Sequence, residues 1–253
     1  MKLESLLQYL DGYLGTSGHS DYATALNGLQ VEGPTEVTKV VTAVDASQAS
    51  ITAAAVMDAD LMIVHHGIFW DGHLPLTGRL GHRARALFEA NIGLYSCHLP
   101  LDSHAEVGNC ILLARAIGVT PLGRIGDYKG ASLGWWGETS EPISLEDLQG
   151  RVSVAVGGGR VEVLRGGPQQ ILRIGVLTGG GGSFVKEAAE LGLHAFVTGE
   201  GSHHTYFDAG EFGIHVLFAG HYATETFGVR ALAKHLGERF GLESEFLDQP
   251  TGL

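Results

Sequence analysis

Two short motifs in this chain each place a histidine four residues before a carboxylate. His98 precedes Asp102, and His221 precedes Glu225. Neutral imidazole nitrogens together with anionic oxygens are the ligands that a borderline-hard divalent cation prefers. A carboxylate can also bridge two metal ions, which a histidine-only site seldom does. The two motifs therefore indicate a site for one or two divalent metal ions.

A third candidate cluster is the adjacent pair His65 and His66. The pair follows the apolar run 61–64, just as the two motifs follow predicted strands at 92–97 and 214–219. Adjacent residues on a strand point to opposite faces, but a loop after the strand can turn both inward. Three polar clusters at three strand ends are hard to explain by packing. We therefore expect His65 and His66 to be metal ligands.

The two spaced motifs have a simpler interpretation as well. Pro100 indicates a helix start or a loop between His98 and Asp102, so Asp102 could cap a helix. The spacing of His221 and Glu225 places both on one helix face, where Glu225 could be a solvated acid of the first turn. We prefer metal ligation because all the clusters follow strands.

A further polar cluster lies at residues 199–204. Glu200 is a candidate general base for a metal-activated water, or an acid that orients a ligand. We expect His203 and His204 on the surface or behind the ligands. Glycines 179–182 precede a predicted helix at 184–191 and form either a tight turn, which we favour, or an anion cradle. Six further histidines receive no role: His73, His82, His104, His194, His215 and His235.

An internal repeat supplies the elements that position these residues. Residues 39–67 align with 173–201 without a gap at an offset of 134, and each copy predicts strand, turn, amphipathic helix and strand. A second helical stretch (81–90; 202–209) and the motif-bearing strand follow each copy. Such alternation predicts parallel sheets with ligands beyond the carboxyl ends of the strands. The alternative is that any two α/β units look this similar.

We therefore expect an α/β fold of two internally duplicated units with mainly parallel sheets and a metal site at strand C-terminal ends between them. The segment 123–168 differs in composition, and we expect a short helix at 143–148 and strands at 152–156 and 161–164. We take it as the opening of the second domain. The expected domains are 1–125, with the His-His and His-x-x-x-Asp motifs, and 126–253, with the Thr-Gly-Glu and His-x-x-x-Glu motifs, whose C-terminal part returns to the shared metal site.

Composition excludes several classes of function. The formal net charge is −12 and Lys and Arg form no basic run, so nucleic-acid binding has little electrostatic support. The first residues predict an amphipathic helix rather than a signal or transit peptide, and no apolar run is long enough to span a bilayer. We expect a cytoplasmic protein without membrane association. Cys97 and Cys110 are expected to be buried thiols rather than a disulfide. The amphipathic helix at the start of the chain is predicted from the spacing of Leu3, Leu6, Leu7 and Leu10.

Five motifs in order resemble the YbgI family, the Nif-three-like dinuclear metal-centre proteins, also called GTP cyclohydrolase type 2 homologues. The resemblance covers nearly the whole chain. It is carried by Asn27-Gly-Leu-Gln-Val-Glu-Gly33, Asp60-Leu-Met-Ile-Val-His-His-Gly67, Tyr95-Ser-Cys-His-Leu-Pro-Leu-Asp102 with Gly108-Asn109, Val197-Thr-Gly-Glu200, and Gly220-His-Tyr-Ala-Thr-Glu225.

The resemblance implies two α/β domains and two divalent metal ions per subunit, of unknown identity among Zn, Mn, Fe and Ni. It also implies a toroidal homohexamer whose metal sites face the interior. An extra domain inserted in some members has no room in the segment 123–168. Glu225 would bridge the metals, and His98 would lie beside them. The implied ligands are His65, His66, Asp102, His221 and Glu225.

The chain departs from the family pattern at two places beside these ligands. Gly67 stands where the family commonly has a proline, and Leu99-Pro100 stand where it has Thr-Asn. Because neither place is itself a ligand, we expect the two departures to affect the substrate fit rather than metal binding.

The resemblance implies a metal-dependent hydrolase that opens the guanine ring of GTP with metal-activated water, with His98 or Glu200 as proton carriers. Two metals near each other lower the pKa of a bridging water and hold an oxyanion, which favours hydrolysis in general. The substrate would be GTP or another anionic small molecule. The alternatives are a metallohydrolase acting on a phosphoester or amide, and a non-enzymatic metal-binding hexameric scaffold or chaperone.

Overall fold

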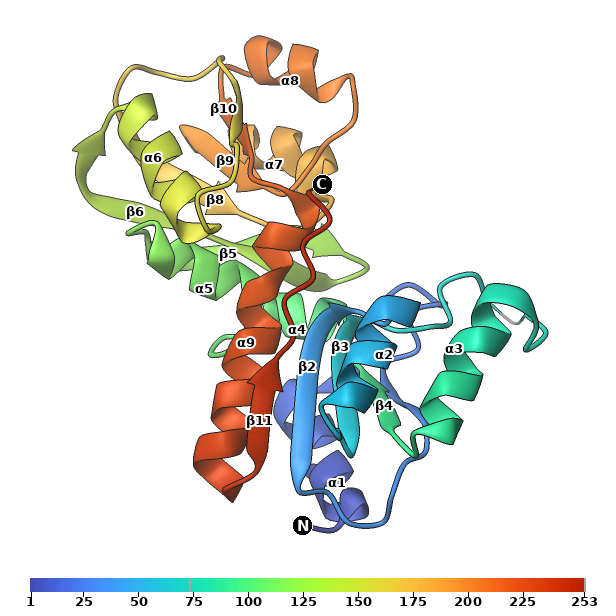
Figure 1. Cartoon of the computed structure of the whole chain (residues 1–253). Coiled ribbons are helices and arrows are strands. Elements are labelled where there is room, and N and C mark those ends of the chain that lie inside the picture. Colours follow the sequence, from blue (N-terminus) through green and yellow to red (C-terminus); the bar gives the residue numbers. More distant parts are fainter. Residues whose placement is uncertain (73, 253) are drawn as a thin grey trace. The chain divides into compact units, whose positions relative to one another are not determined.

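The computed structural model describes residues 1–72 and 74–252, so His73 lies outside the described residues. The chain forms two compact units (Figure 1). Unit 1 contains residues 1–101 and 228–249, and unit 2 contains residues 102–227 and the tail from Pro250. We expect a first domain of residues 1–125 from the sequence; the compact units divide after Leu101, and residues 228–249 belong to unit 1.

Unit 1 is built on a five-stranded sheet in the order β1-β4-β3-β2-β11, which is parallel except where β1 pairs with β4. The central strand β3 is buried along nearly its whole length, as the apolar run before His65 predicts for a strand covered on both faces. The strands are β1 (Gly28–Val31), β2 (Lys39–Asp45), β3 (Leu61–His66), β4 (Gly93–Ser96) and β11 (Glu243–Phe246).

The helices of unit 1 bury apolar faces in the expected way. Every third or fourth residue of α1 is buried, which confirms the predicted amphipathic helix at the start of the chain. Helix α2 begins after Ser47, whose hydroxyl accepts from the Ser50 amide in a capping box. The helices are α1 (Leu3–Leu14), α2 (Gln48–Val56) and α3 (Gly78–Glu89), together with α4 (Leu99–Ser103) and α9 (His221–Phe240), which continue from one unit into the other.

Unit 2 is built on a six-stranded sheet in the order β5-β6-β8-β9-β10-β7. Its centre, β8-β9-β10, is parallel, and the flanking strands run antiparallel. The elements are α5 (Asn109–Ala116), β5 (Thr120–Tyr128), β6 (Ala131–Ile143), α6 (Leu145–Ala155), β7 (Glu162–Leu164), β8 (Ile171–Val176), the 3-10 helix η2 (Gly181–Phe184), α7 (Val185–Glu190), β9 (Ala195–Thr198), α8 (Thr205–Glu211) and β10 (His215–Phe218).

The strand predicted at 152–156 is wrong, because α6 continues through Ala155. Ser144 and Asp147 form a capping box that starts the helix. Leu148 and Val152 are both fully buried at helical spacing, so packing against the core overrides the β propensity of the valines.

Strand pairing preserves the internal repeat residue by residue. In unit 1, Val40 pairs with Leu61, and in unit 2 Ile174 pairs with Ala195, so both partners are displaced by 134. The edge strand β7 begins 134 residues after the edge strand β1, and each runs antiparallel to the strand beside it. The order β1-β4-β3-β2 in unit 1 therefore corresponds to β7-β10-β9-β8 in unit 2, which supports an internally duplicated α/β fold.

Each unit has its own hydrophobic core between its sheet and its helices. The core of unit 1 includes Met62 and Val64 of β3, and the core of unit 2 includes Ile174 and Val197 of its parallel strands. A search of the described residues finds no helix with the length and apolar character needed to cross a membrane.

Candidate metal centre

Three imidazoles gather at the carboxyl end of the sheet in unit 1. His65 and His66 end β3, and His98 follows β4, the neighbouring parallel strand. One ring nitrogen from each of the three lies within 4.8 Å of the other two. Because parallel strands end at the same edge of a sheet, two clusters 33 positions apart in sequence become one.

Each of these rings has Nδ1 against an oxygen that only accepts hydrogen bonds. For His65 the oxygen is the Cys97 carbonyl at 3.0 Å, and for His66 it is the Asp45 carboxylate at 2.9 Å. For His98 it is the Asp21 carboxylate at 2.8 Å. Nδ1 must therefore carry the proton, which makes Nε2 the lone-pair nitrogen of a neutral ring. This is the tautomer of a histidine that coordinates through Nε2.

Asp21 is the most strongly held of these orienting groups. Its carboxylate also accepts from the side-chain amide of Asn27 at 2.8 Å and from the Leu99 amide at 3.0 Å. Burial raises the pKa of Asp21, but the hydrogen bond from His98, the charge that His98 carries when protonated, and the hydrogen bonds from Asn27 and the Tyr22 amide together outweigh this, so the pKa lies below its usual value. Asn27 in turn accepts from the His98 amide at 2.7 Å. Asp21 and Asn27 thus fix both the ring and the backbone of His98.

Aromatic side chains surround the same imidazoles. The Trp70 ring lies edge-on to His98 at a centroid distance of 4.7 Å and to His66 at 5.6 Å. Tyr22 lies 5.8 Å from His98 and 6.3 Å from Trp70. These rings place aromatic surface directly beside the histidine cluster.

The two departures from the family pattern have local explanations. A Cβ on Gly67 would lie 2.2 Å from the amide nitrogen of Gln30, whose oxygen accepts from the Ile68 amide at 2.9 Å. The glycine therefore lets Gln30 brace the loop after the His-His pair. Pro100 occupies the second position of α4, where the missing N–H costs no helical hydrogen bond.

Asp102 is held in unit 2 by two donors on one oxygen. Its Oδ1 accepts from Asn109 Nδ2 and from Thr178 Oγ1, both at 2.9 Å. The Thr178 hydroxyl also lies 3.2 Å from the sulfur of Cys110, and since it donates to Asp102 it accepts from the thiol. Burial raises the pKa of Cys110 to about 12, so the thiol stays protonated and remains a donor. The chain Cys110–Thr178–Asp102 fixes the orientation of the carboxylate.

His221 and Glu225 lie one turn apart on α9, and Glu225 Oε1 is 3.0 Å from His221 Nε2. His221 Nδ1 donates to Glu200 Oε1 at 2.9 Å. The hydrogen bond with Glu225 is the largest cause that raises the pKa of His221 to about 9, in spite of desolvation. Asp102 and Glu225 each offer an oxygen within 4.8 Å of the other. The raised pKa favours a protonated His221 beside Glu225, and a metal ion held by these two side chains would have to displace that proton.

The glycine run lets its loop approach these ligands. Gly179 has φ +63°, and a Cβ there would lie 2.3 Å from Glu225 Oε1 and 3.3 Å from His221 Nε2. The Gly179 amide donates to Thr224 Oγ1 at 3.0 Å, and the Gly181 amide donates to Thr198 Oγ1 at 3.0 Å. The run is a tight turn in which the Gly179 and Gly181 amides donate to protein hydroxyls and the Gly182 amide donates to the Glu200 carbonyl, in line with the turn expected from the sequence.

The two spaced motifs are not equivalent in the duplicated framework. Gly93 of β4 corresponds to His215 of β10, a displacement of 122, whereas His98 and His221 are 123 apart. His98 consequently precedes its helix, and His221 is the first residue of α9. Glu200, at the repeat position of His66, orients a histidine from unit 2, as Asp45 does in unit 1.

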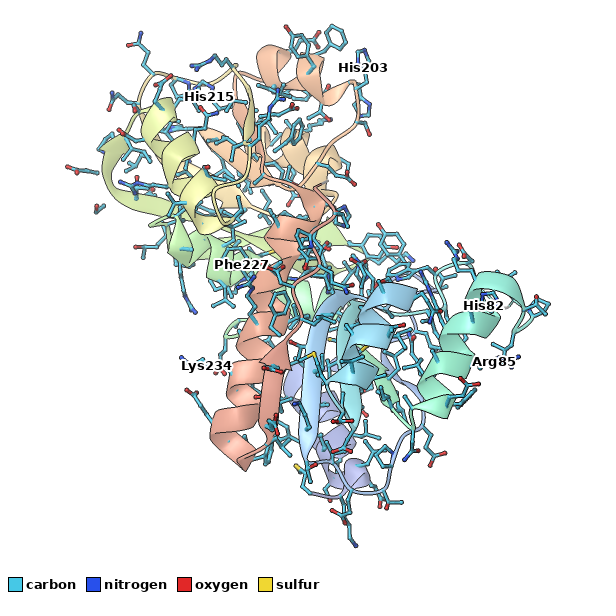
Figure 2. All side chains as sticks on the ribbon, viewed as in Figure 1. His82, Arg85, His203, His215, Phe227 and Lys234 are labelled. Carbon is cyan, nitrogen blue, oxygen red and sulfur yellow. The ribbon has the colours of Figure 1, made fainter. Side chains whose placement is uncertain are left out.

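Other histidines have structural roles or lie apart from the ligands. His215 Nδ1 accepts from the Gly167 amide at 3.2 Å, and its Nε2 donates to the Pro168 carbonyl at 3.0 Å. His194 accepts from the Leu172 amide at 3.0 Å. His203 is exposed on unit 2, as expected for a surface residue (Figure 2).

Sequence reasoning missed the side chains that orient the ligands. Asp21 and Asp45 sit in no local motif, and Thr178 and Asn109 lie 76 and 7 positions from the carboxylate they bind. A usable signal existed only for Asn27 and Asn109, which lie in segments of the family resemblance. Trp70 gave no signal beyond its nearness to His66 in the chain.

A model of the Duf34/NIF3 (NGG1p interacting factor 3) family matches residues 1–251. A Deinococcus radiodurans protein named GTP cyclohydrolase 1 type 2 homolog is 40% identical over 250 residues, which are 99% of this chain and 94% of the relative. A solved structure of the protein ybgI, described as of unknown function, is 41% identical with a TM-score of 0.93, and the match covers 100% of both chains. A crystal structure of a Thermus thermophilus protein is 38% identical with a TM-score of 0.90 and the same coverage.

Proposed function

The chain belongs to the Duf34/NIF3 family, and we propose that it is a metal-dependent hydrolase with two divalent metal ions per subunit. The proposed ligands are His65, His66, Asp102, His221 and Glu225. This ligand set is the one that the family resemblance implies, and it combines imidazole nitrogens with carboxylate oxygens.

One observation carries the proposal above all others. Four imidazoles, those of His65, His66, His98 and His221, each have Nδ1 bound to an oxygen of the protein. Histidines that ligate metals almost always donate their second ring nitrogen in this way. Packing alone does not require Nδ1 to face an acceptor oxygen at four separate rings, so the shared arrangement favours a site built for cations.

The donor set fits the metals that the sequence suggested. Neutral nitrogens with carboxylate oxygens suit Zn, Mn, Fe or Ni, and no thiolate that would select a softer ion is among them. Glu225 carries one oxygen toward His221 and lies within 4.8 Å of Asp102, a position suited to bridging. When bound, two such ions lower the pKa of water and stabilise an oxyanion.

We propose GTP as the substrate, in line with the name given to relatives such as the Deinococcus radiodurans protein. Water would add to C8 of guanine, the C8–N9 bond would break, and a second hydrolysis would release formate. His98 is the proposed proton carrier, because Asp21 stabilises its protonated form from the Nδ1 side. Glu200 accepts a hydrogen bond from His221 through one carboxylate oxygen. Its proposed role is to orient that ring and to accept a proton.

Metal-loaded full-length protein incubated with GTP tests this function. We expect loss of guanine absorbance together with formate release, and Glu225→Ala should abolish both. Glu238→Ala is the matched control, because it removes an exposed carboxylate that pairs with Lys234 on the surface of α9. Two tightly held ions with no turnover of GTP would contradict the proposal and favour a metal-binding scaffold. Turnover of p-nitrophenyl phosphate but not of GTP would favour a phosphoester hydrolase.

We also propose that six copies assemble into a ring, as the family resemblance implies. Light scattering coupled to size exclusion should give a mass of about 160 kDa, six times the 26.7 kDa of the chain. A mass of one or two chains would contradict it.

A further inference from the structure

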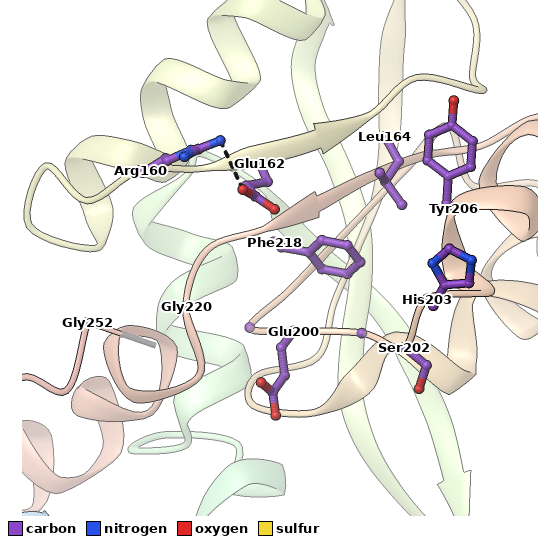
Figure 3. A pocket seen from close by; sticks show the side chains of 12 residues that line it. Arg160, Glu162, Leu164, Glu200, Ser202, His203, Tyr206, Phe218, Gly220 and Gly252 are labelled. Carbon is purple, nitrogen blue, oxygen red and sulfur yellow. Dashed lines mark ion pairs between the residues drawn. The ribbon is translucent and has the colours of Figure 1, made fainter.

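Unit 2 contains a cavity of about 590 Å³ beside Glu200, distinct from the cluster of metal-ligand candidates. It opens beyond the carboxyl ends of β9 and β10, against the edge strand β7 (Figure 3). Its size is that of a small-molecule site, and crevices at this edge of an open α/β sheet commonly take ligands.

Aromatic rings supply most of the apolar wall. Phe218, the last residue of β10, projects into the cavity, and Tyr206 and His203 stand along one side (Figure 3). Tyr206 lines the cavity and is 65% exposed, so its ring is accessible to a ligand. Gly201 keeps the floor open, since a Cβ there would lie 2.8 Å from the Phe218 ring. Ser202 and Glu200 add polar groups at the lower edge.

The duplicated framework shows what fills the same place in unit 1. Glu162 and Phe218, which pair across β7 and β10, correspond to Gly28 and Ser96, which pair across β1 and β4. In unit 1 the loop after β3 lays the Trp70 indole over this strand end, against His66 and His98. The same loop position in unit 2 is taken by the exposed His204, and the space is a cavity instead.

We propose that this cavity binds the planar heteroaromatic ring of the substrate, in the place that the chain's own indole takes in unit 1. The ring stacks on Phe218 and Tyr206, and its polar edge faces Ser202 and Glu200. The inference rests on the proposed function, because Glu200 also holds His221, so a ring bound here lies next to the candidate ligands. Stacking on aromatic side chains tolerates any flat base and contributes substantially to binding.

The test measures binding of guanosine and of inorganic tripolyphosphate to the full-length protein by equilibrium dialysis. Guanosine contains the ring but lacks the phosphates that metal ions attract. Tripolyphosphate contains the phosphates but lacks the ring. We expect Phe218→Leu and Tyr206→Leu each to weaken guanosine binding about tenfold, with tripolyphosphate binding unchanged. Phe212→Leu is the control, because it removes an exposed ring at the end of α8 that does not line the cavity.

Unchanged guanosine binding in both cavity variants, or no saturable guanosine binding at millimolar concentration, would overturn the proposal. Circular dichroism of each variant establishes that it is folded. If guanosine binding depends on Phe218 and Tyr206 but GTP releases no formate, the cavity assignment stands and the proposed hydrolase activity is contradicted. Formate release from GTP at an unchanged rate and KM in Phe218→Leu and Tyr206→Leu would leave the hydrolase standing and overturn the cavity assignment.

Discussion

Asp21 and His98 form a buried ion-pair-like contact, with Oδ1 and Nδ1 2.8 Å apart although the residues are 77 positions apart in the chain. The same carboxylate accepts from Asn27 and from the Leu99 amide through its other oxygen. One acidic side chain thereby sets the tautomer of a histidine and the start of the helix that leads to Asp102.

Asp21→Asn should destabilise the protein by about 1–3 kcal/mol, because an amide has one accepting oxygen where the carboxylate used two. Either His98, or Asn27 together with the Leu99 amide, then loses its acceptor. Urea unfolding measures the change, and imidazole nitrogen NMR should show His98 losing its fixed Nδ1–H form. Asp71→Asn, which removes an exposed partner of Arg79, should cost less than about 0.5 kcal/mol. Equal effects of the two substitutions would contradict this role for Asp21.

Thr178→Val should lower the affinity for metal about 10–100-fold, because it removes a donor that orients Asp102 while it keeps the branched shape of the side chain. Thr178→Ser retains the hydroxyl and should bind metal nearly as the wild type does. Isothermal titration with Zn²⁺ or Mn²⁺ measures both. If the serine variant loses as much affinity as the valine variant, the methyl group rather than the hydrogen bond is responsible.

Gly179→Ala should displace Glu225, since the added Cβ would lie 2.3 Å from its Oε1, and the left-handed backbone adds strain of about 1 kcal/mol. Metal content after gel filtration should fall below that of the wild type. The neighbouring Gly180→Ala is the matched control, because its Cβ meets nothing nearer than 4.0 Å and its φ is −82°. Equal metal content in the two variants would refute the close-approach argument.

The stability of the metal-free protein should depend on pH through His221. Its folded pKa of about 9 lies above the ordinary 6.5, so the contribution is fully present below about pH 6.5 and is lost as the pH rises through about 9. Metal binding displaces this proton, so the apparent metal affinity should rise over the same interval. Urea unfolding between pH 6 and pH 9.5 should show a decline that is smaller in His221→Gln and unchanged in His203→Gln. A pH profile of His221→Gln identical to that of the wild type would contradict the raised pKa.

Local patterns in the sequence were sufficient for the repeated units and for the residues at the strand ends. The offset of 134 reappears in the strand register, because a buried parallel strand tolerates no slip of one residue without turning its apolar side chains outward. Patterns of this kind could not give the orienting groups, because Asp21, Asp45 and Thr178 meet their partners only through tertiary packing. The one wrong element, the strand at 152–156, came from valine propensity that the helix packing of Val152 overrides.

Anomalous scattering from crystals of the native protein tests the central claim most directly, because it reports the number, identity and position of bound metals together. The account predicts two peaks per chain, each about 2.0–2.3 Å from nitrogen or oxygen ligands, with the histidines coordinating through Nε2 while Nδ1 keeps its oxygen partner. Peaks absent from His65, His66, Asp102, His221 and Glu225 in metal-supplemented crystals, or coordination through Nδ1, would contradict it.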